Sequence, residues 1–175
     1  MNETEGAPAP KHKASLGVAI GSLIAGLLIG LPIGYLVAPA PAPGVPANTI
    51  VLADSSVHLS VLAGPAGQFV FSIGGLENPT IQVRTNTQVT VHFENIDPAV
   101  NHSMSVLSAA PPYPADVTAE PAFAGAETPD AHMGTMPGEE ATFTFTASIA
   151  GTYYYICHVA GHATAGMFGK FVVTA

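Results

Sequence analysis

Residues 48–175 contain nine short runs in which apolar and polar side chains alternate, and this pattern limits the fold more than any other feature. Alternation with a period of two is typical of a strand with one buried face. Gly, Pro, Asn and Asp, which favour turns, separate the runs. The pattern predicts an all-β domain over 48–175, an antiparallel sandwich or barrel. The nine expected strands cover residues 49–53, 56–62, 68–73, 80–84, 87–95, 102–107, 141–147, 152–157 and 167–174.

The alternation stops between residues 108 and 140. Prolines stand at six positions in this stretch, which excludes a continuous helix. We therefore expect a long ordered loop over 108–140. The chain has 18 Gly, 16 Pro and no Trp, and only 9% of its residues are charged. This composition fits turn-rich β structure better than a bundle of amphipathic helices.

The segment 14–38 is a run of 25 residues without a charge. About 20 apolar residues suffice to cross a bilayer as a helix, so the run predicts one transmembrane helix that serves as a signal anchor. Lys11 and Lys13 precede the run, and no Lys or Arg follows it before Arg84. By the positive-inside rule, residues 1–13 are cytoplasmic and the C-terminal domain lies on the extracytoplasmic face of the cell membrane.

A cleaved signal peptide is the alternative interpretation of the same segment. Its apolar core would have about 7–15 residues, which is shorter than this run. The one cleavage candidate, Ala38-Pro39-Ala40, is followed by Pro41, a poor residue after a cleavage point. Residues 39–47, PAPAPGVPA, form a Pro/Ala-rich stretch that predicts an extended, semi-rigid linker between the membrane and the domain.

The charge balance is acidic, with 12 Asp and Glu against 4 Lys and Arg and a net charge of −8. Nucleic-acid binding needs basic side chains for phosphate contacts, so we exclude nucleic acid as a partner. Most carboxylates in 48–175 have no basic partner available, because only Arg84 and Lys170 are basic there. Since few ion pairs can form, we expect a domain that tolerates acid.

The only cysteine, Cys157, begins the segment CHVAGHATAGM at 157–167. Thiolate, imidazole and thioether side chains make a soft ligand set, and one Cys, two His and a weak axial Met form the blue-copper arrangement. Cys157, His162 and Met167 supply three of these groups from one loop between two expected strands. His102, at the start of another expected strand, fits as the second imidazole. The sequence therefore predicts a metal site made by these four residues.

Other interpretations of Cys157 are a buried apolar thiol, a catalytic thiol with His158 or His162 as base, and a zinc ligand. A catalytic thiol leaves Met167 unexplained, and structural zinc sites prefer several cysteines. His158 is the least suitable ligand, because neighbours on an extended strand point to opposite faces.

Several segments of the domain resemble the rusticyanin/sulfocyanin group of cupredoxins. The resemblance covers most of 67–175, and the membrane anchor with its Pro/Ala-rich spacer is similar to that of sulfocyanins. The matching segments are NPTIQV at 78–83, NHSMSV at 101–106, PPY at 111–113, AFAGA at 122–126 and GTYYYICHVAGHATAGMFGKFVV at 151–173.

The resemblance implies a Greek-key cupredoxin sandwich with one type 1 copper per chain, bound by His102, Cys157, His162 and Met167. It also implies that Ser103 can form a hydrogen bond near the cysteine sulfur. The implied function is electron transfer in an extracytoplasmic respiratory chain, often one linked to iron oxidation, and not enzymatic catalysis. The implied partners are redox proteins, either cytochromes or a terminal oxidase.

His158 departs from the rusticyanin pattern and raises the alternative of a copper-containing subunit of a larger oxidase. The chain has no His-x-His motif, and a dinuclear copper centre would need a second cysteine. A copper carrier is a further alternative, suggested by His132, Met133 and Met136 in the long loop. Methionines in a loop over an apolar site more often pack than bind metal, so we expect these three residues to pack.

Overall fold

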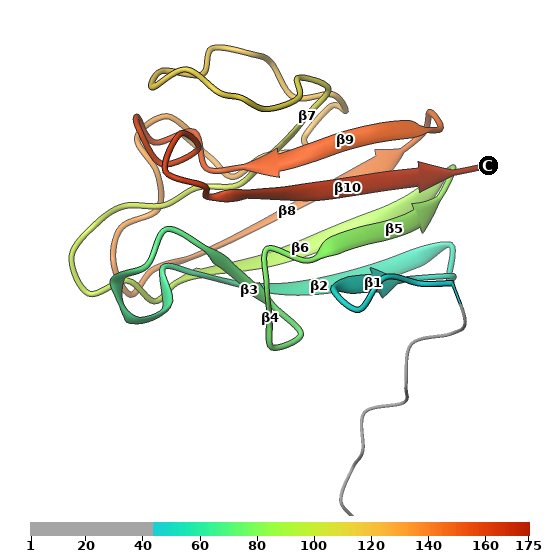
Figure 1. Ribbon diagram of the computed structural model, residues 1–175, viewed down its shortest axis with the longest axis horizontal. Helices are drawn as coiled ribbons and strands as arrows, with labels where there is room; N and C mark the ends of the chain where they lie inside the picture. The colour runs from blue at the N-terminus through green and yellow to red at the C-terminus, as the bar shows by residue number, and fades with distance from the viewer. Residues whose placement is uncertain (1–43) are drawn as a thin grey trace, which may run out of the picture. The chain divides into compact units, whose positions relative to one another are not determined.

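The computed structural model describes residues 44–175, which form a two-layered β-sandwich (Figure 1). The predictions for 1–13, for 14–38 and for most of the linker lie outside these residues. Within 44–175, no helix has the length and apolar character that a membrane crossing requires. The elements are β1 (Thr49–Val51), β2 (Ser56–Ala63), η1 (Pro65–Gly67), β3 (Phe71–Ile73), β4 (Leu76–Glu77), β5 (Thr80–Arg84), β6 (Thr87–Asn95), β7 (Ser105–Leu107), β8 (Glu140–Ala147), β9 (Gly151–Ile156) and β10 (Phe168–Thr174).

Each layer is a five-stranded sheet, with strand orders β1-β5-β10-β9-β7 and β4-β3-β2-β6-β8. The prediction of an all-β sandwich is confirmed, but the prediction that its strands are antiparallel is wrong in part. The pairs β1–β5, β5–β10 and β2–β6 are parallel. The chain changes sheet between consecutive strands such as β5 and β6, so strands distant in sequence become parallel neighbours. Alternation shows which face of a strand is buried, and it carries no information about the direction of the neighbouring strand.

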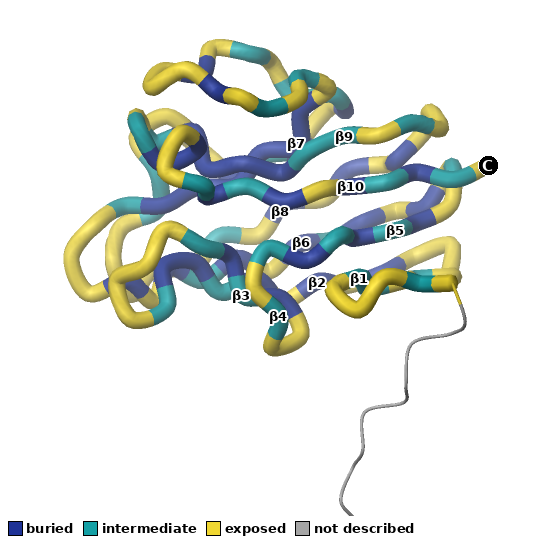
Figure 2. The backbone as a smooth tube through the Cα atoms, viewed as in Figure 1, coloured by how far each residue is buried: buried dark blue, intermediate teal, exposed yellow. Residues whose placement is uncertain are grey.

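The core lies between the two sheets, where the inward residues of each strand meet (Figure 2). In β6, five residues are buried and the four between them are exposed or half-buried, as expected for a strand with one face inward. Phe71, Phe93, Tyr155 and Phe171 are the largest fully buried side chains of this core. A second, smaller apolar cluster packs beneath the long loop and contains Leu107, Tyr113, Val117, Ile156 and Ala163.

The long loop is ordered, as predicted, and residues 108–139 contain no helix or strand. Backbone hydrogen bonds attach it to the sheet edge, for example from the amide of Ala122 to the carbonyl of Val106. The expected strand at 102–107 is shorter than predicted and begins at Ser105. His102 itself forms only an isolated bridge with Thr135, because the long loop and not a strand pairs with it.

Candidate metal centre

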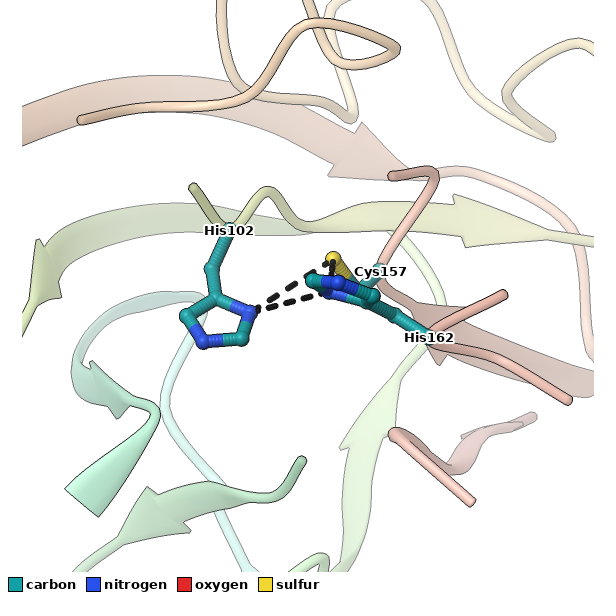
Figure 3. Close-up of side chains that lie close together, drawn as sticks. All are labelled: His102, Cys157 and His162. Atoms are coloured by element: carbon teal, nitrogen blue, oxygen red, sulfur yellow. Dashed lines mark hydrogen bonds between the residues drawn. The ribbon is translucent and has the colours of Figure 1, made fainter. Parts of the chain in front are cut away.

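Three of the four predicted ligands meet at one end of the sandwich. His102 precedes β7, Cys157 follows β9 directly, and His162 lies in the loop between β9 and β10. Their side chains point toward one another (Figure 3). His102 Nδ1 lies 3.1 Å from His162 Nδ1, and Cys157 Sγ lies 3.3 Å from His162 Nδ1 and 4.0 Å from His102 Nδ1.

The donor set fits copper. An ion at about 2.0–2.1 Å from each nitrogen and about 2.3 Å from sulfur holds such donors roughly 3–4 Å apart, which is the spacing found here. Two imidazoles and one thiolate are soft ligands of the kind copper accepts. His102 and Cys157 are fully buried and His162 is 8% exposed, so the site excludes water.

The backbone of His102 is held by the long loop. Its amide donates to the carbonyl of Thr135 at 3.1 Å, and its carbonyl accepts from the amide of Thr135 at 2.8 Å. The side chain of Asn95 donates both to Thr135 and to the carbonyl of Val100. The long loop therefore positions a ligand that lies about 30 residues earlier in the chain.

The ring of His102 is held by a carboxylate. Its Nε2 lies 3.2 Å from Oδ2 of Asp97, which leaves Nδ1 facing Cys157 and His162. Burial lowers the pKa of His102, and Asp97 opposes that effect only in part. Burial by itself would raise the pKa of Asp97, but hydrogen bonds from the amides of Ala99 and Val100 and from His102 bring it below its ordinary value. The pair therefore combines a carboxylate with an imidazole that is neutral near pH 7.

The sulfur of Cys157 accepts a hydrogen bond from the amide of Ser103 at 3.3 Å, and the Ser103 hydroxyl lies 3.7 Å away. Burial raises the pKa of the thiol, and the hydrogen bonds from Ser103 oppose this rise. The Ser103 hydroxyl also accepts from the amide of His158 at 3.0 Å. Ser103 therefore occupies the position next to the sulfur that the resemblance implies for it.

The ligand loop between β9 and β10 is closed by its own backbone. The amide of Cys157 donates to the carbonyl of Met167 at 3.1 Å, and the amide of Met167 donates to the carbonyl of His162 at 3.0 Å. Gly161 and Gly166 have φ angles of 85° and 103°, which favour glycine, and they allow the tight curl. Met167 is fully buried next to this closure. Burial, and next the neighbouring His102, lower the pKa of His162.

His158 lies outside the cluster of His102, Cys157 and His162, as its position after Cys157 predicts. Its ring stacks on that of His132 at 4.7 Å between centroids. The ring is 2% exposed, its Nδ1 lies 3.4 Å from the Ser105 hydroxyl, and its Nε2 has no hydrogen-bond partner. Burial and the nearby His132 lower the pKa of His158 to about 4.

The structure corrects one expectation about the long loop. Met133 and Met136 are 73% and 54% exposed, so the prediction that these two residues pack is wrong. His132 is also exposed, although its ring stacks on that of His158. None of the residues from 44 to 175 covers these two methionine side chains, and a sequence pattern does not reveal whether a loop residue is covered.

Sequence reasoning missed two residues at the site. Asp97 contacts His102, as described above. Phe69 lies on the ring of His162 with centroids 4.5 Å apart and is 39% exposed, so it forms part of the surface over this ligand. Phe69 comes from a loop distant in sequence from all the predicted ligands, whereas Asp97 lies five residues before His102. Neither has a spacing that marks it as a site residue.

Comparison with known proteins agrees with this geometry. Residues 43–175 match the model of the sulfocyanin (SoxE) domain family. Rusticyanin from Acidithiobacillus ferrooxidans (strain ATCC 23270) is 33% identical over 132 residues, covering 74% of this chain and 69% of the relative. Rusticyanin from Acidithiobacillus ferridurans shows the same identity and coverage.

Solved structures show the same fold. A structure of reduced rusticyanin superposes with a TM-score of 0.63 at 31% identity, covering 74% of this chain and 87% of the other. A further structure, of the copper protein rusticyanin, gives a TM-score of 0.62 at 31% identity, covering 74% of this chain and 84% of the other. With its cluster of two histidines and a cysteine, the chain belongs to the sulfocyanin family of rusticyanin-like blue copper cupredoxins, and its cofactor is type 1 copper.

Proposed function

We propose that this protein carries single electrons in an extracytoplasmic respiratory chain of an acidophile, held at the membrane by residues 14–38. The observation that carries the electron-transfer part is the buried cluster of His102, Cys157 and His162. The match to the sulfocyanin family supports it. The uncharged run in the sequence supports the anchor.

We propose that Met167 would supply the fourth ligand to copper. It is fully buried, and its backbone is bonded to both Cys157 and His162. A weak axial thioether tunes the redox potential of a blue-copper site. Met167→Leu is therefore expected to shift the potential while the protein keeps its colour. Met104→Leu, a matched change at a methionine buried in the core, should leave the potential unchanged.

When bound at this site, copper supplies reversible one-electron chemistry. The chain contributes a rigid and dry donor set, because Thr135 and Asp97 both hold His102 by hydrogen bonds and Ser103 holds Cys157. Donors that do not move between the two oxidation states keep the reorganisation cost small. His162 is the most exposed of the three clustered ligands, and Phe69 covers its ring. A redox partner would dock over these two residues.

A redox titration combined with an oxygen electrode tests the electron-carrier function. The copper-loaded domain should show one reversible one-electron wave and no sustained oxygen consumption with a reductant. Steady oxygen consumption by the isolated chain would instead favour the oxidase alternative. Within residues 44–175, His102, Cys157 and His162 are the only group of three or more His, Cys, Asp or Glu side chains close enough to share a metal, which supports a carrier with one centre.

A copper carrier is the second candidate, because His132, Met133 and Met136 are exposed and chemically suited to Cu(I). A carrier would release its copper rapidly to a Cu(I) chelator, and that release would slow when Met133 and Met136 are both changed to Leu. An electron carrier should retain its copper over many redox cycles.

The anchor and the partners need native membranes for their test. Fractionation should place the full chain with the membrane, and a protease added outside the cell should remove the domain. We expect cytochromes or a terminal oxidase to co-purify.

A link to iron oxidation is part of the proposal, since a matched rusticyanin comes from Acidithiobacillus ferrooxidans. Ferrous iron added with the purified donor should then reduce the domain.

A further inference from the structure

We propose that Asp97 is a positioning residue that fixes the tautomer of His102 and lowers the redox potential of the centre through its buried charge. The expected effect on the redox potential rests on the proposed electron-transfer function. The expected tautomer of His102 rests on contacts that are present without metal.

Asp97 is held on both sides, so its carboxylate cannot turn away from His102. Oδ1 accepts from the amides of Ala99 at 2.8 Å and Val100 at 3.0 Å, while Oδ2 faces His102 Nε2 at 3.2 Å. The amide of Asp97 donates to the side chain of Asn95 at 3.0 Å. Oδ1 therefore binds the backbone of its own loop, and Oδ2 binds the ring of the ligand His102.

Gly64 packs directly against the pair. A Cβ atom on Gly64 would lie 2.5 Å from both Asp97 Cβ and His102 Nε2, so only glycine fits against them. Asp97 is 3% exposed and His102 is fully buried. The hydrogen bond between them is therefore shielded from competing water.

The carboxylate determines which ring nitrogen of His102 can bind metal. A carboxylate oxygen only accepts, so the hydrogen bond requires a proton on Nε2. The neutral ring then has a bare lone pair on Nδ1, which is the atom that faces Cys157 and His162. Metal-binding histidines commonly have such a partner on the other nitrogen, and the partner also raises the basicity of the ligand.

The charge of Asp97 stays uncompensated by any cationic side chain within the described part of the chain. The pair with His102 is the only ion-pair contact found among residues 44–175, and His102 is neutral when it serves as a ligand. A buried negative charge next to a metal ligand favours the more positive oxidation state of the metal. Asp97 should therefore favour Cu(II) over Cu(I) and lower the potential.

The variant Asp97→Asn removes the charge with little change in size. At pH 7 we expect the redox potential of this variant to rise. The equilibrium constant for reduction of Cu(II) to Cu(I) should increase about tenfold, which is about 59 mV for a one-electron couple. Asp130→Asn is the matched control, because Asp130 is exposed in the loop that pairs with His102 and the variant has the same net charge. Equal potentials in both variants would overturn the proposal.

The tautomer is read from the metal-free wild type by ¹⁵N NMR of the histidine rings, so the test does not depend on whether a variant folds. We expect His102 to carry its proton on Nε2. A proton on Nδ1 would overturn the positioning role. If the copper-loaded wild type shows no reversible wave, the electron-carrier function fails, whereas the NMR result still decides the role of Asp97 toward His102.

Discussion

The amide of Ser103 donates to the sulfur of Cys157 at 3.3 Å, although the two residues are 54 positions apart in the chain. Ser103 follows the ligand His102, and Cys157 is itself a predicted ligand. The segment before β7 therefore supplies both an imidazole and a hydrogen bond to the thiolate, and it joins the two halves of the metal centre.

The hydroxyl of Ser103 is expected to affect both stability and potential. Ser103→Ala leaves the buried amide of His158 without its acceptor, which should cost about 1–3 kcal/mol in the free energy of unfolding. The variant also removes a polar group 3.7 Å from the sulfur, so the thiolate becomes a stronger donor to Cu(II) and the potential should fall. Urea unfolding and voltammetry measure the two effects. Ser60→Ala, at an exposed position in β2, should change neither.

Gly64→Ala should damage the metal centre, and Gly67→Ala is its matched control. Both glycines have a left-handed φ, 70° and 73°, so both variants carry a backbone cost of about 1–2 kcal/mol. A Cβ on Gly64 would collide with Asp97 and His102, whereas nothing lies within 4 Å of a Cβ on Gly67. We expect Gly64→Ala to be about 1–3 kcal/mol less stable than Gly67→Ala and to bind copper more weakly. Equal copper affinity in the two variants would contradict this close packing.

The hydroxyl of Tyr155 is a buried support of the fold. It donates to the carbonyl of Pro79 at 2.6 Å, both residues are buried, and burial raises the pKa of Tyr155. Tyr155→Phe leaves that carbonyl unpaired and should cost about 1–3 kcal/mol. Tyr153→Phe removes a more exposed bond to the carbonyl of Ile149, and water can replace it there, so its cost should be smaller. Chemical denaturation of both variants checks whether Tyr155→Phe loses more unfolding free energy than Tyr153→Phe.

Acid tolerance should depend on bound copper. Burial lowers the pKa of His102, His158 and His162 below 6.5, so the unfolded chain takes up protons before the folded chain does. The stability that the neutral forms of these three histidines allow is fully present above pH 6.5 and falls as the pH drops toward their folded pKa values, which for His158 is about 4. Each group costs up to about 1.4 kcal/mol per pH unit in that window.

Copper removes two of these three penalties, because it occupies one nitrogen of His102 and of His162 and so holds both rings in their neutral form. Thermal unfolding of the metal-free and copper-loaded domains at pH 7 and pH 4.5 measures the difference. We expect a large loss of stability in the metal-free domain and a small one in the loaded domain. Equal losses in the two forms would refute this explanation of acid tolerance.

The parts of the fold that follow local rules could be predicted from the sequence. Alternation located nine of the ten strands, seven of them to within two residues, while β3 and β7 begin three residues later than predicted. Proline placement identified the long loop. The parallel pairings could not be predicted, because alternation reports a buried face and not a partner. The two-residue strand β4 (Leu76–Glu77) is too short to show any period.

The site could be predicted where its residues form a motif. Cys157 and His162 are five residues apart, and their chemistry indicates a metal, whereas His102 was found as the imidazole that opens a neighbouring segment. Asp97 could not be found in this way, since its role depends on a loop that folds back onto His102. The exposure of Met133 was missed because side-chain chemistry does not show which loops are covered by other parts of the fold.

The central claim is that Cys157 binds copper as a thiolate together with His102 and His162. The direct measurement is the visible absorption spectrum of the purified domain after addition of one equivalent of Cu(II), for the wild type and for Cys157→Ser. The account predicts an intense blue or green band from thiolate-to-copper charge transfer in the wild type and its complete loss in the variant. A colourless copper complex of the wild type, or a variant that keeps the band, would contradict the claim.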